Sequence, residues 1–477
     1  MSSWVLYVEA RKHSDARHEG PSSPKTASWN EKKEIIDEES EETEKLRTFI
    51  LIQCMKITML ASAASFPQLF LEHKTASIFK VPQGLREQSP EHCQPKVVSI
   101  GPYHRDDSKL LIQNQHKWSC VCFLYLVYRL DLDSWIDDMR RWEAEARRYY
   151  SEAVSMDSQQ FLEMLLVDCC FIFVVLDIID KKLSTALPSD QIMLELLLLG
   201  NQIPFFVLEK LNKYTSTPED ITQLALHSFG NIRTLGGRQL QIRPGMEKVH
   251  LLHLFRLSLY PADIESSAID VVHPPLHHAE VESKAPAVLN STAPRHVPSA
   301  TELQDRYAVK FKKGTADNFL DIQFRNGVME IPFLQISNYS GTLLCNLIAF
   351  EQCYRPIEPR VATYAAFMDC LINKESDADL LESNGILLNR LPISRNAAVF
   401  FSEMSPRAGF PNSSKYLDHV FEGIHSYQNN RWNRWKADLK LNYFSNPWVS
   451  LSVVAGAVLL IVGLIQTWYS VLAYYHR

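Results

Sequence analysis

The sequence closes on VSLSVVAGAVLLIVGLIQTWYSV (residues 449–471), a run of about 23 residues without a charged side chain. As a helix it would be about 34 Å long, which is enough to cross a hydrocarbon core of about 30 Å. Eleven of its residues up to Thr467 are Val, Leu or Ile. Together these side chains favour membrane insertion by about 3–6 kcal/mol. The stretch predicts a transmembrane helix, and the alternative is a helix buried in a protein core.

Tryptophans mark both ends of this helix, with Trp448 before it and Trp468 after it. Such rings prefer the headgroup level of a bilayer. The predicted anchor positions are Trp448, Val449, Gly456, Leu460, Gly463, Ile465 and Trp468. The small residues Ser452, Gly456 and Gly463 lie roughly along one helix face, which suits either a homo-oligomer within the membrane or a lipid-facing groove.

The flanking charges predict an orientation. The segment before the helix carries four basic residues and one acidic residue: Arg431, Arg434, Lys436, Lys440 and Asp438. The only basic residues after the helix are His476 and Arg477. The positive-inside rule then predicts a single-pass protein with its large N-terminal part in the cytosol. The charges do not distinguish the plasma membrane from an endomembrane. Three glycosylation triplets, at Asn290, Asn338 and Asn412, would argue for the opposite orientation if they were used.

Composition limits the remaining possibilities. The 477 residues are 46% hydrophobic and 22% charged, as in an ordinary folded protein. A net charge of −6 provides no basic footprint for nucleic acid. Nine cysteines in so long a chain, an odd number, do not form a disulfide framework, and this usage fits a reducing compartment.

We expect three regions along the chain. Residues 1–75 read as a poorly ordered extension with a dense acidic run and no apolar core of signal-peptide length at the start. A membrane-associated segment at residues 49–66 is the alternative there. Residues 76–442 are predicted to form the globular domain, with a flexible loop or linker at 262–298. Residues 443–477 are predicted to form the membrane anchor.

The first half of the domain reads as mainly helical. Residues 109–150 and 161–179 are predicted helices, and the second should lie in the core because it is apolar nearly all round. Residues 192–211 form another, which Pro204 should kink or restart. Asp168, Asn201 and Gln202 are polar side chains within these apolar runs. They form either a ligand site or the hydrogen-bonding partners of a broken helix.

Two short strands are predicted before these helices, at residues 78–82 and 96–100. Gly101 and Pro102 follow the second strand directly and predict a turn. This turn would present Tyr103 and His104.

The second half contains a clear hairpin signal. Asn326 and Gly327 form a two-residue turn between alternating apolar runs. The predicted register places Phe324 opposite Met329, Ile322 opposite Ile331 and Leu320 opposite Phe333. Pro332 predicts that the return arm is an edge strand. Further helices are expected at 300–312, 342–353, 361–373, 395–404 and 415–442. The predicted fold class is α+β: a predominantly α-helical globular domain with a small antiparallel hairpin or sheet, plus one C-terminal transmembrane helix.

Motifs of known chemistry are absent. The sequence lacks the nucleophile elbow, the dinucleotide glycine pattern, the phosphate-binding loop and the two-histidine zinc helix. The histidines at 273, 277 and 278 lack paired cysteines or regular spacing. His104 is a candidate base, and Asp168, Glu302 and Glu330 are candidate acids, but nothing fixes their geometry. We therefore expect no cofactor and no metal.

Several blocks of sequence nevertheless resemble a known family. The blocks are VSIGPYH (98–104), NQIPFFVL (201–208), NLIAFEQC (346–353), ATEL (300–303), FRNGVMEIP (324–332) and YFSNPW (443–448). From about residue 78 to the C-terminus the chain resembles the plant domain of unknown function 247 family. The positions singled out with these motifs are Gly101, Pro102, Tyr103, His104, Asp168, Asn201, Gln202, Pro204, Asn326, Gly327 and Glu351.

The resemblance implies a plant-specific protein with one C-terminal membrane span and no established enzymatic activity. Some members are similar to recognition determinants of grass self-incompatibility, and no catalytic residue can be carried over. This chain departs from the family where Gly200 replaces a Glu, Glu195 an Asp and Cys169 a Gly, and where residues 113–115 lack an acidic side chain. We expect a membrane-tethered protein–protein interaction module whose partners are the bilayer and an unknown protein; the alternative is a membrane-anchored enzyme.

Overall fold

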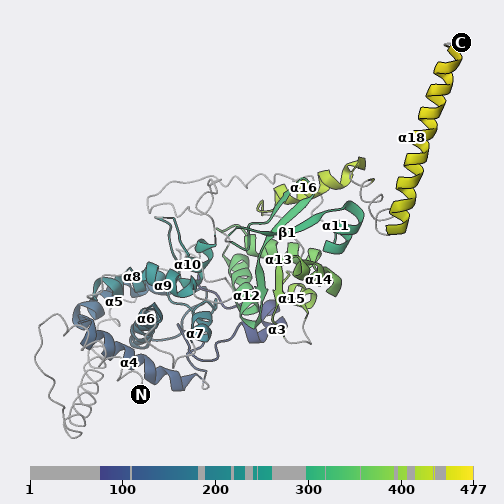
Figure 1. The fold of residues 1–477 in the computed structure, drawn as a ribbon. Coiled ribbons are helices and arrows are strands. Elements are labelled where there is room, and N and C mark those ends of the chain that lie inside the picture. The colour runs from purple at the N-terminus through teal and green to yellow at the C-terminus, as the bar shows by residue number, and fades with distance from the viewer. Residues whose placement is uncertain are drawn as a thin grey trace, which may run out of the picture. The chain divides into compact units, whose positions relative to one another are not determined.

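The computed structural model describes residues 76–107, 110–180, 189–215, 220–230, 240–243, 245–259, 297–316, 318–354, 356–391, 396–405, 414–432, 435 and 447–475. The predicted extension at 1–75 and nearly all of the predicted linker at 262–298 lie outside these residues. The chain divides into two compact units. Unit 1 is Met1–His277 with Ser337–Val361, and unit 2 is His278–Ile336 with Ala362–Arg477. The mainly helical fold with small sheets confirms the predicted class (Figure 1).

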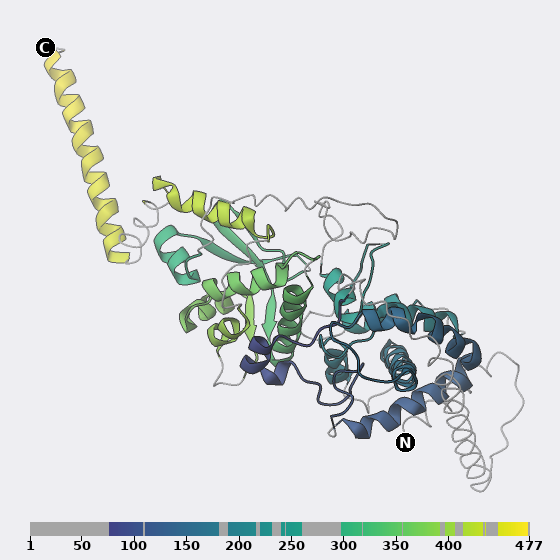
Figure 2. The ribbon, with the colours of Figure 1, turned by 180° about the vertical axis from the view of Figure 1, so that it is seen from behind.

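The regular secondary structure in the described part of unit 1 is helical. Its helices are α3 (Gln83–Gln88), η2 (Pro90–His92), α4 (Leu111–Val127), α5 (Leu132–Arg148), α6 (Ser158–Asp180), α7 (Ser189–Glu195), α8 (Phe205–Lys213), α9 (Ile221–Gly230), α10 (Leu251–Ser258) and α12 (Asn338–Cys353). Helix α6 contacts α4, α5, α8 and α9 (Figures 1 and 2). Its most apolar stretch is 83% buried, which confirms the prediction of a core helix.

The helix predicted over residues 109–150 is wrong as a single element, because the chain breaks between α4 and α5. Arg129 adopts a left-handed backbone with φ of 51°. Asp131 then caps α5 by accepting the Ser134 N–H at 3.2 Å. Within α5, Trp135, Met139 and Trp142 are buried at helical spacing, so this helix has one core face.

The two short strands predicted at 78–82 and 96–100 are also wrong. In the first, Ile78 makes only an isolated parallel bridge to Tyr150. The second is extended, but side chains of Glu195 and Asn201 take its backbone hydrogen bonds. Alternating apolar residues indicate which side chains are buried. They do not indicate whether a neighbouring strand or a side chain forms the hydrogen bonds of the backbone.

Helices α7 and α8 are separated by a turn that ends at Pro204. Its φ of −59° and ψ of 133° are extended, and α8 begins at the next residue. Proline fixes φ and lacks an N–H, so it suits the residue before a helix. The prediction that Pro204 starts a new helix is confirmed, although the preceding helix already ends at Glu195.

Unit 2 contains two small sheets and surrounding helices. Its elements are α11 (Ala300–Tyr307), β1 (Lys310–Gly314), β2 (Gln323–Arg325), β3 (Val328–Pro332), β4 (Leu334–Ile336), α13 (Arg360–Leu371, which starts in the last residues of unit 1), α14 (Glu375–Ser383), β5 (Leu387–Asn389), α15 (Ala397–Met404), α16 (Asp418–Asn429) and α18 (Pro447–Tyr475). One sheet has the order β1-β3-β2, and the other pairs β4 with β5 in parallel. Helix α16 packs on β2 (Figure 2).

The predicted hairpin is present but shorter than expected. Asn326 and Gly327 have φ of 50° and 77°, and Phe324 pairs with Met329. The antiparallel ladder ends at Gln323, so the outer two predicted pairs do not form. β3 is the central strand because β1 pairs with it in parallel as far as Pro332. The prediction that the return arm is an edge is therefore wrong.

The helix predicted at 300–312 ends early. Ser299 caps α11 by accepting the Glu302 N–H, and Ala308 terminates the helix with φ of 54°. Residues 310–312 belong to β1 instead, where Phe311 alone points into the core. The predicted helices at 342–353, 361–373 and 395–404 are confirmed by α12, α13 and α15, whereas α16 ends at Asn429, before the predicted limit of 442.

Candidate functional site

The family-like turn that begins at Gly101 is built by side chains from the core of unit 1. Gly101 has φ of 73°, and an added Cβ would lie 2.4 Å from the carbonyl oxygen of Gln202. Only glycine combines this backbone conformation with so close an approach. The Tyr150 hydroxyl donates to the same carbonyl at 3.3 Å, so the turn is held against residue 202.

Glu195 holds the extended segment that leads into this turn. Its two carboxylate oxygens accept the N–H groups of Lys96, Val97 and Val98 at 2.8–3.0 Å. The carboxylate is 1% exposed. Hydrogen bonds to a buried carboxylate compensate for its lost hydration. Although the resemblance expects Asp here, Glu195 makes a complete set of contacts.

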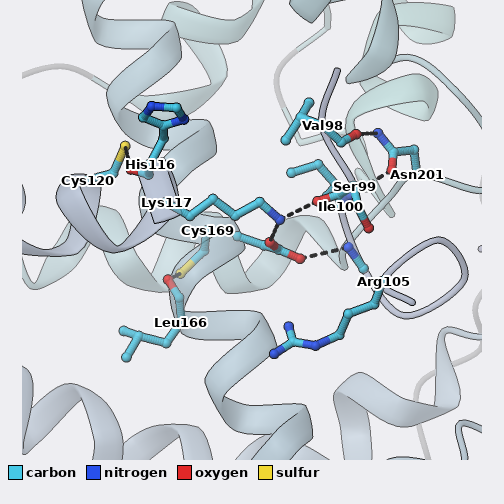
Figure 3. Close-up of polar contacts among 12 residues, drawn as sticks. Val98, Ser99, Ile100, Arg105, His116, Lys117, Cys120, Leu166, Cys169 and Asn201 are labelled. Atoms are coloured by element: carbon cyan, nitrogen blue, oxygen red, sulfur yellow. Dashed lines mark hydrogen bonds and ion pairs between the residues drawn. The ribbon is translucent and has the colours of Figure 1, made fainter. Parts of the chain in front are cut away.

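Asn201 and Gln202 hold the same region from the turn after α7. The Asn201 side chain accepts the Ile100 N–H at 2.6 Å and donates to the Val98 carbonyl at 3.1 Å (Figure 3). The Gln202 amide donates to the carbonyls of Leu196 and Leu198 at 2.7 and 2.8 Å. Both side chains satisfy backbone groups left free where the helix is broken, which is the second of the two predicted roles.

Asp168 completes the network with a buried ion pair. One of its oxygens accepts the Gly101 N–H at 2.7 Å, and the other lies 2.5 Å from the Lys117 ammonium. Figure 3 shows the Lys117 side chain extended toward Ser99, whose carbonyl it also contacts. Lys117 is 2% exposed and Asp168 1%. The carboxylate thus has a partner on each oxygen.

Tyr103 and His104 are only half-buried. The Tyr103 hydroxyl donates to the Ile78 carbonyl at 3.3 Å, and burial raises its pKa. Burial lowers the pKa of His104, because a desolvated imidazolium is disfavoured. A Cβ at Gly200 would lie 3.1 Å from His104 Nε2. His104 therefore favours the neutral form more strongly than an exposed histidine does.

Glu351 forms a second buried ion pair in unit 1. Its carboxylate accepts the Arg256 guanidinium at 3.0 Å and the Val361 N–H at 3.1 Å. Arg256 also reaches the Glu358 carbonyl at 2.5 Å. These contacts join α10 to the segment that follows α12.

The remaining family-motif residues shape the backbone. Pro102 lies in the turn after Gly101 and is half-buried. In unit 2, an added Cβ on Gly327 would lie 2.4 Å from the Tyr427 hydroxyl. The hairpin turn is thus packed against α16.

Helix α18 is apolar and is exposed along nearly all of its described length. Among the described residues, two helices are long and apolar enough to cross a membrane, α6 and α18. The candidate stretch of α18, Val454–Tyr475, has no buried share. Leu460, Ile465 and Trp468 are 65%, 50% and 68% exposed. Apart from neighbouring backbone of the same helix, no atom lies within 4 Å of a Cβ built on Gly456 or Gly463. Trp448 and Val449 are in the helix, and their side chains lie outside the description.

A comparison with known sequences agrees with these motifs. The family profile described as "Plant protein of unknown function" (DUF247) matches residues 78–462.

The chain belongs to this family.

Two Arabidopsis thaliana proteins are similar to this DUF247 chain over most of their length. The UPF0481 protein At3g47200 is 28% identical over 434 residues, which cover 87% of this chain and 91% of the relative. The UPF0481 protein At3g02645 is 23% identical over 486 residues, which cover 83% and 90%. No solved structure matches the chain. The expected family is confirmed. The names of the two relatives state no activity.

Within this DUF247 fold, the family-motif polar residues of unit 1 act mainly on backbone. Sequence reasoning grouped Asp168 with Asn201 and Gln202 but missed Lys117, Arg256 and Asn346. Asn346 accepts the Leu199 N–H at 2.9 Å and donates to the His92 carbonyl at 2.8 Å. Within the described ranges, no cluster of three or more His, Cys, Asp or Glu side chains could hold a metal ion. The polar network of unit 1 is suited to hold the turn at Gly101 in place. Asp168 is not suited to act as a general base, because both of its carboxylate oxygens already have partners.

Proposed function

We propose that this DUF247 protein is a single-pass membrane protein whose C-terminal helix tethers a protein–protein interaction module to the bilayer. The observation that carries the proposal is the contrast between α6 and α18. Both are long and apolar, but 83% of the α6 stretch is covered by the protein and none of the α18 stretch is. Exposed apolar side chains of this number are stable only against lipid or a partner.

The interaction role is supported by what the buried polar residues do. Asp168, Glu195 and Asn201 are used to fix the backbone around Gly101. Because these buried polar side chains fix the backbone of the turn, the domain is suited to presenting a rigid surface to a protein partner. The basic residues before α18 favour a cytosolic orientation of this surface.

The tether is tested by removing residues 447–477 and comparing the truncated and full-length chains after cell fractionation. The full-length chain should stay in the membrane pellet after alkaline extraction, and the truncated chain should become soluble. A truncated chain that still resists extraction would show that another segment spans the membrane. Protease treatment of sealed vesicles then tests the orientation, because a cytosolic unit 1 is digested without detergent.

The interaction role needs a separate test. Full-length protein and a tail-only control, residues 443–477 on a fluorescent protein, are purified from the same membranes after mild crosslinking. A recognition module should capture a defined protein in stoichiometric amount that the tail alone does not capture. Equal recovery from both samples would contradict it.

A further inference from the structure

Two exposed indole rings follow α16 in unit 2. Trp432 is 67% exposed and Trp435 is 58% exposed. Their ring centroids are 5.7 Å apart, and the planes meet at 86°. Indole carries a large apolar face and one N–H donor, so it prefers an interface between water and an apolar phase. A pair left in water marks a contact that the isolated chain does not make.

The charge around these rings favours an anionic contact. Arg431 is exposed and directly precedes Trp432. From 431 to 440 the sequence has four basic residues and one acidic residue, although the whole chain has a net charge of −6. Each basic side chain near an anionic membrane surface strengthens binding by about fivefold. Tryptophans interleaved with positive charge match the headgroup layer of such a surface.

The position of the two tryptophans in the chain also favours contact with a membrane surface. Helix α18 begins at Pro447, twelve positions after Trp435, with eleven residues between them. Twelve residues span at most about 42 Å when fully extended. Once α18 is inserted, the indole pair cannot move far from the bilayer surface, and the second contact becomes intramolecular.

We propose that Arg431, Trp432 and Trp435 form an interfacial contact that binds the headgroups of an anionic phospholipid leaflet. This inference rests on the proposed membrane anchorage of α18 and adds a second contact to it. The contact would hold unit 2 against the cytosolic leaflet, since that leaflet carries the anionic lipid.

The test uses the full-length chain, labelled with 5-fluorotryptophan and inserted in nanodiscs that contain a gadolinium-chelate lipid. The nanodiscs hold either phosphatidylcholine alone or phosphatidylcholine with 30% phosphatidylserine. W432F and W435F assign the two fluorine resonances. The lipid-bound gadolinium should broaden both resonances at least twofold more with phosphatidylserine, and 0.5 M salt should reverse the difference. Trp135 and Trp142, buried in unit 1, serve as references whose broadening should be the same in both lipids.

A charge variant and its matched control complete the test. R431Q/R434Q/K436Q/K440Q should lose the phosphatidylserine effect, whereas K310Q/K312Q/R390Q/K415Q removes as much charge elsewhere in unit 2 and should keep it. Resonances of Trp432 and Trp435 as sharp as those of Trp135 in both lipids would overturn the contact and favour a protein partner. Equal broadening in both lipids would overturn the anionic preference. Trp468 reports insertion independently, because its resonance broadens in every lipid if α18 spans the disc.

Discussion

The Lys117 ammonium lies 2.5 Å from a carboxylate oxygen of Asp168, and the two side chains are 2% and 1% exposed. Lys117 belongs to α4 and Asp168 to α6. The pair also binds the backbone of Ser99 and Gly101. One ion pair therefore fixes the family-like turn to two core helices.

Replacing Lys117 with Met should destabilise unit 1 by about 3–5 kcal/mol, because Asp168 would remain buried without its counter-ion. Urea unfolding followed by tryptophan fluorescence measures the loss. R141M is the matched control: Arg141 pairs with Asp138 at 2.9 Å but is 76% exposed, so the cost should stay below about 1 kcal/mol. The double variant K117M/D168L should recover part of the loss. Similar costs for K117M and R141M would show that the buried pair has no special role.

Replacing Gly101 with Ala should destabilise unit 1 by about 2–4 kcal/mol, because it adds both left-handed strain and a clash with the Gln202 carbonyl. Two other glycines separate these effects. Gly245 has φ of 81° with no atom near an added Cβ, so G245A should cost about 1 kcal/mol. Gly84 lies in α3 with open space around it, and G84A should be neutral or stabilising by up to about 1 kcal/mol. If G101A costs no more than G245A, the close approach to Gln202 is not present in solution.

The sequence was sufficient where the signal is local. The apolar character of α6 on nearly all its faces predicted a core helix, and Asn326 followed by Gly327 predicted the hairpin turn. Pro204 marked the start of α8 for the same reason, since its covalent geometry acts on its neighbours. In each case the residues that decide the structure lie within a few positions of it.

The features that the sequence pattern did not predict depend on partners elsewhere in the chain. Residues 96–100 are extended because Glu195 and Asn201, about 100 residues later, take their N–H groups. Pairing of β1 with β3 likewise joins Lys310 to Val328, although KFKKG shows little alternation. The role of Asp168 likewise depends on Lys117, which lies 51 residues earlier in the chain. Side-chain to backbone contacts of this kind leave no periodic pattern in a sequence.

Acidification should weaken unit 1 through His250. Its Nδ1 accepts the His253 N–H at 3.1 Å and its Nε2–H donates to the Ser77 carbonyl at 3.1 Å, so the folded ring is neutral. Burial lowers its pKa to about 3, below the value of about 6.5 in the unfolded chain. On acidification the unfolded state therefore binds the proton first. The contribution of neutral His250 to the free energy of unfolding is complete above about pH 6.5. As the pH falls to about 3, the free energy of unfolding decreases by roughly 4 kcal/mol.

The variant H250N isolates this effect, because Asn keeps an acceptor at the N-terminus of α10 but does not titrate. Urea midpoints measured between pH 7 and pH 4 should fall less steeply for H250N than for the wild type. His253 contributes a slope of the same sign in both proteins, since burial lowers its pKa as well. Parallel slopes would show that His250 is protonated equally in the folded and unfolded states.

The hairpin of unit 2 offers a similar test. Replacing Gly327 with Ala should destabilise unit 2 by about 1–3 kcal/mol, because φ is 77° and the Tyr427 ring end, 2.4 Å from the new Cβ, must move. G385A has φ of 69° and open space, so it should cost about 1 kcal/mol. The double variant G327A/Y427A should relieve the clash and cost less than the two single changes added together. Additive costs would place Tyr427 away from the turn.

The anchor predicts a sharp response to charge in α18. Leu460 and Ile465 are near the middle of the helix, and an Arg there costs about 2.5–3.5 kcal/mol of insertion free energy at each site. L460R/I465R should therefore remove the favourable insertion energy of about 3–6 kcal/mol and release the chain from membranes at alkaline pH. L460A/I465A keeps the helix uncharged and should leave the chain in the pellet. Because neither side chain is covered by the rest of the protein, neither variant should change the urea midpoint of unit 1. Release of both variants, or of neither, would mean that α18 is held by something other than its transfer into lipid.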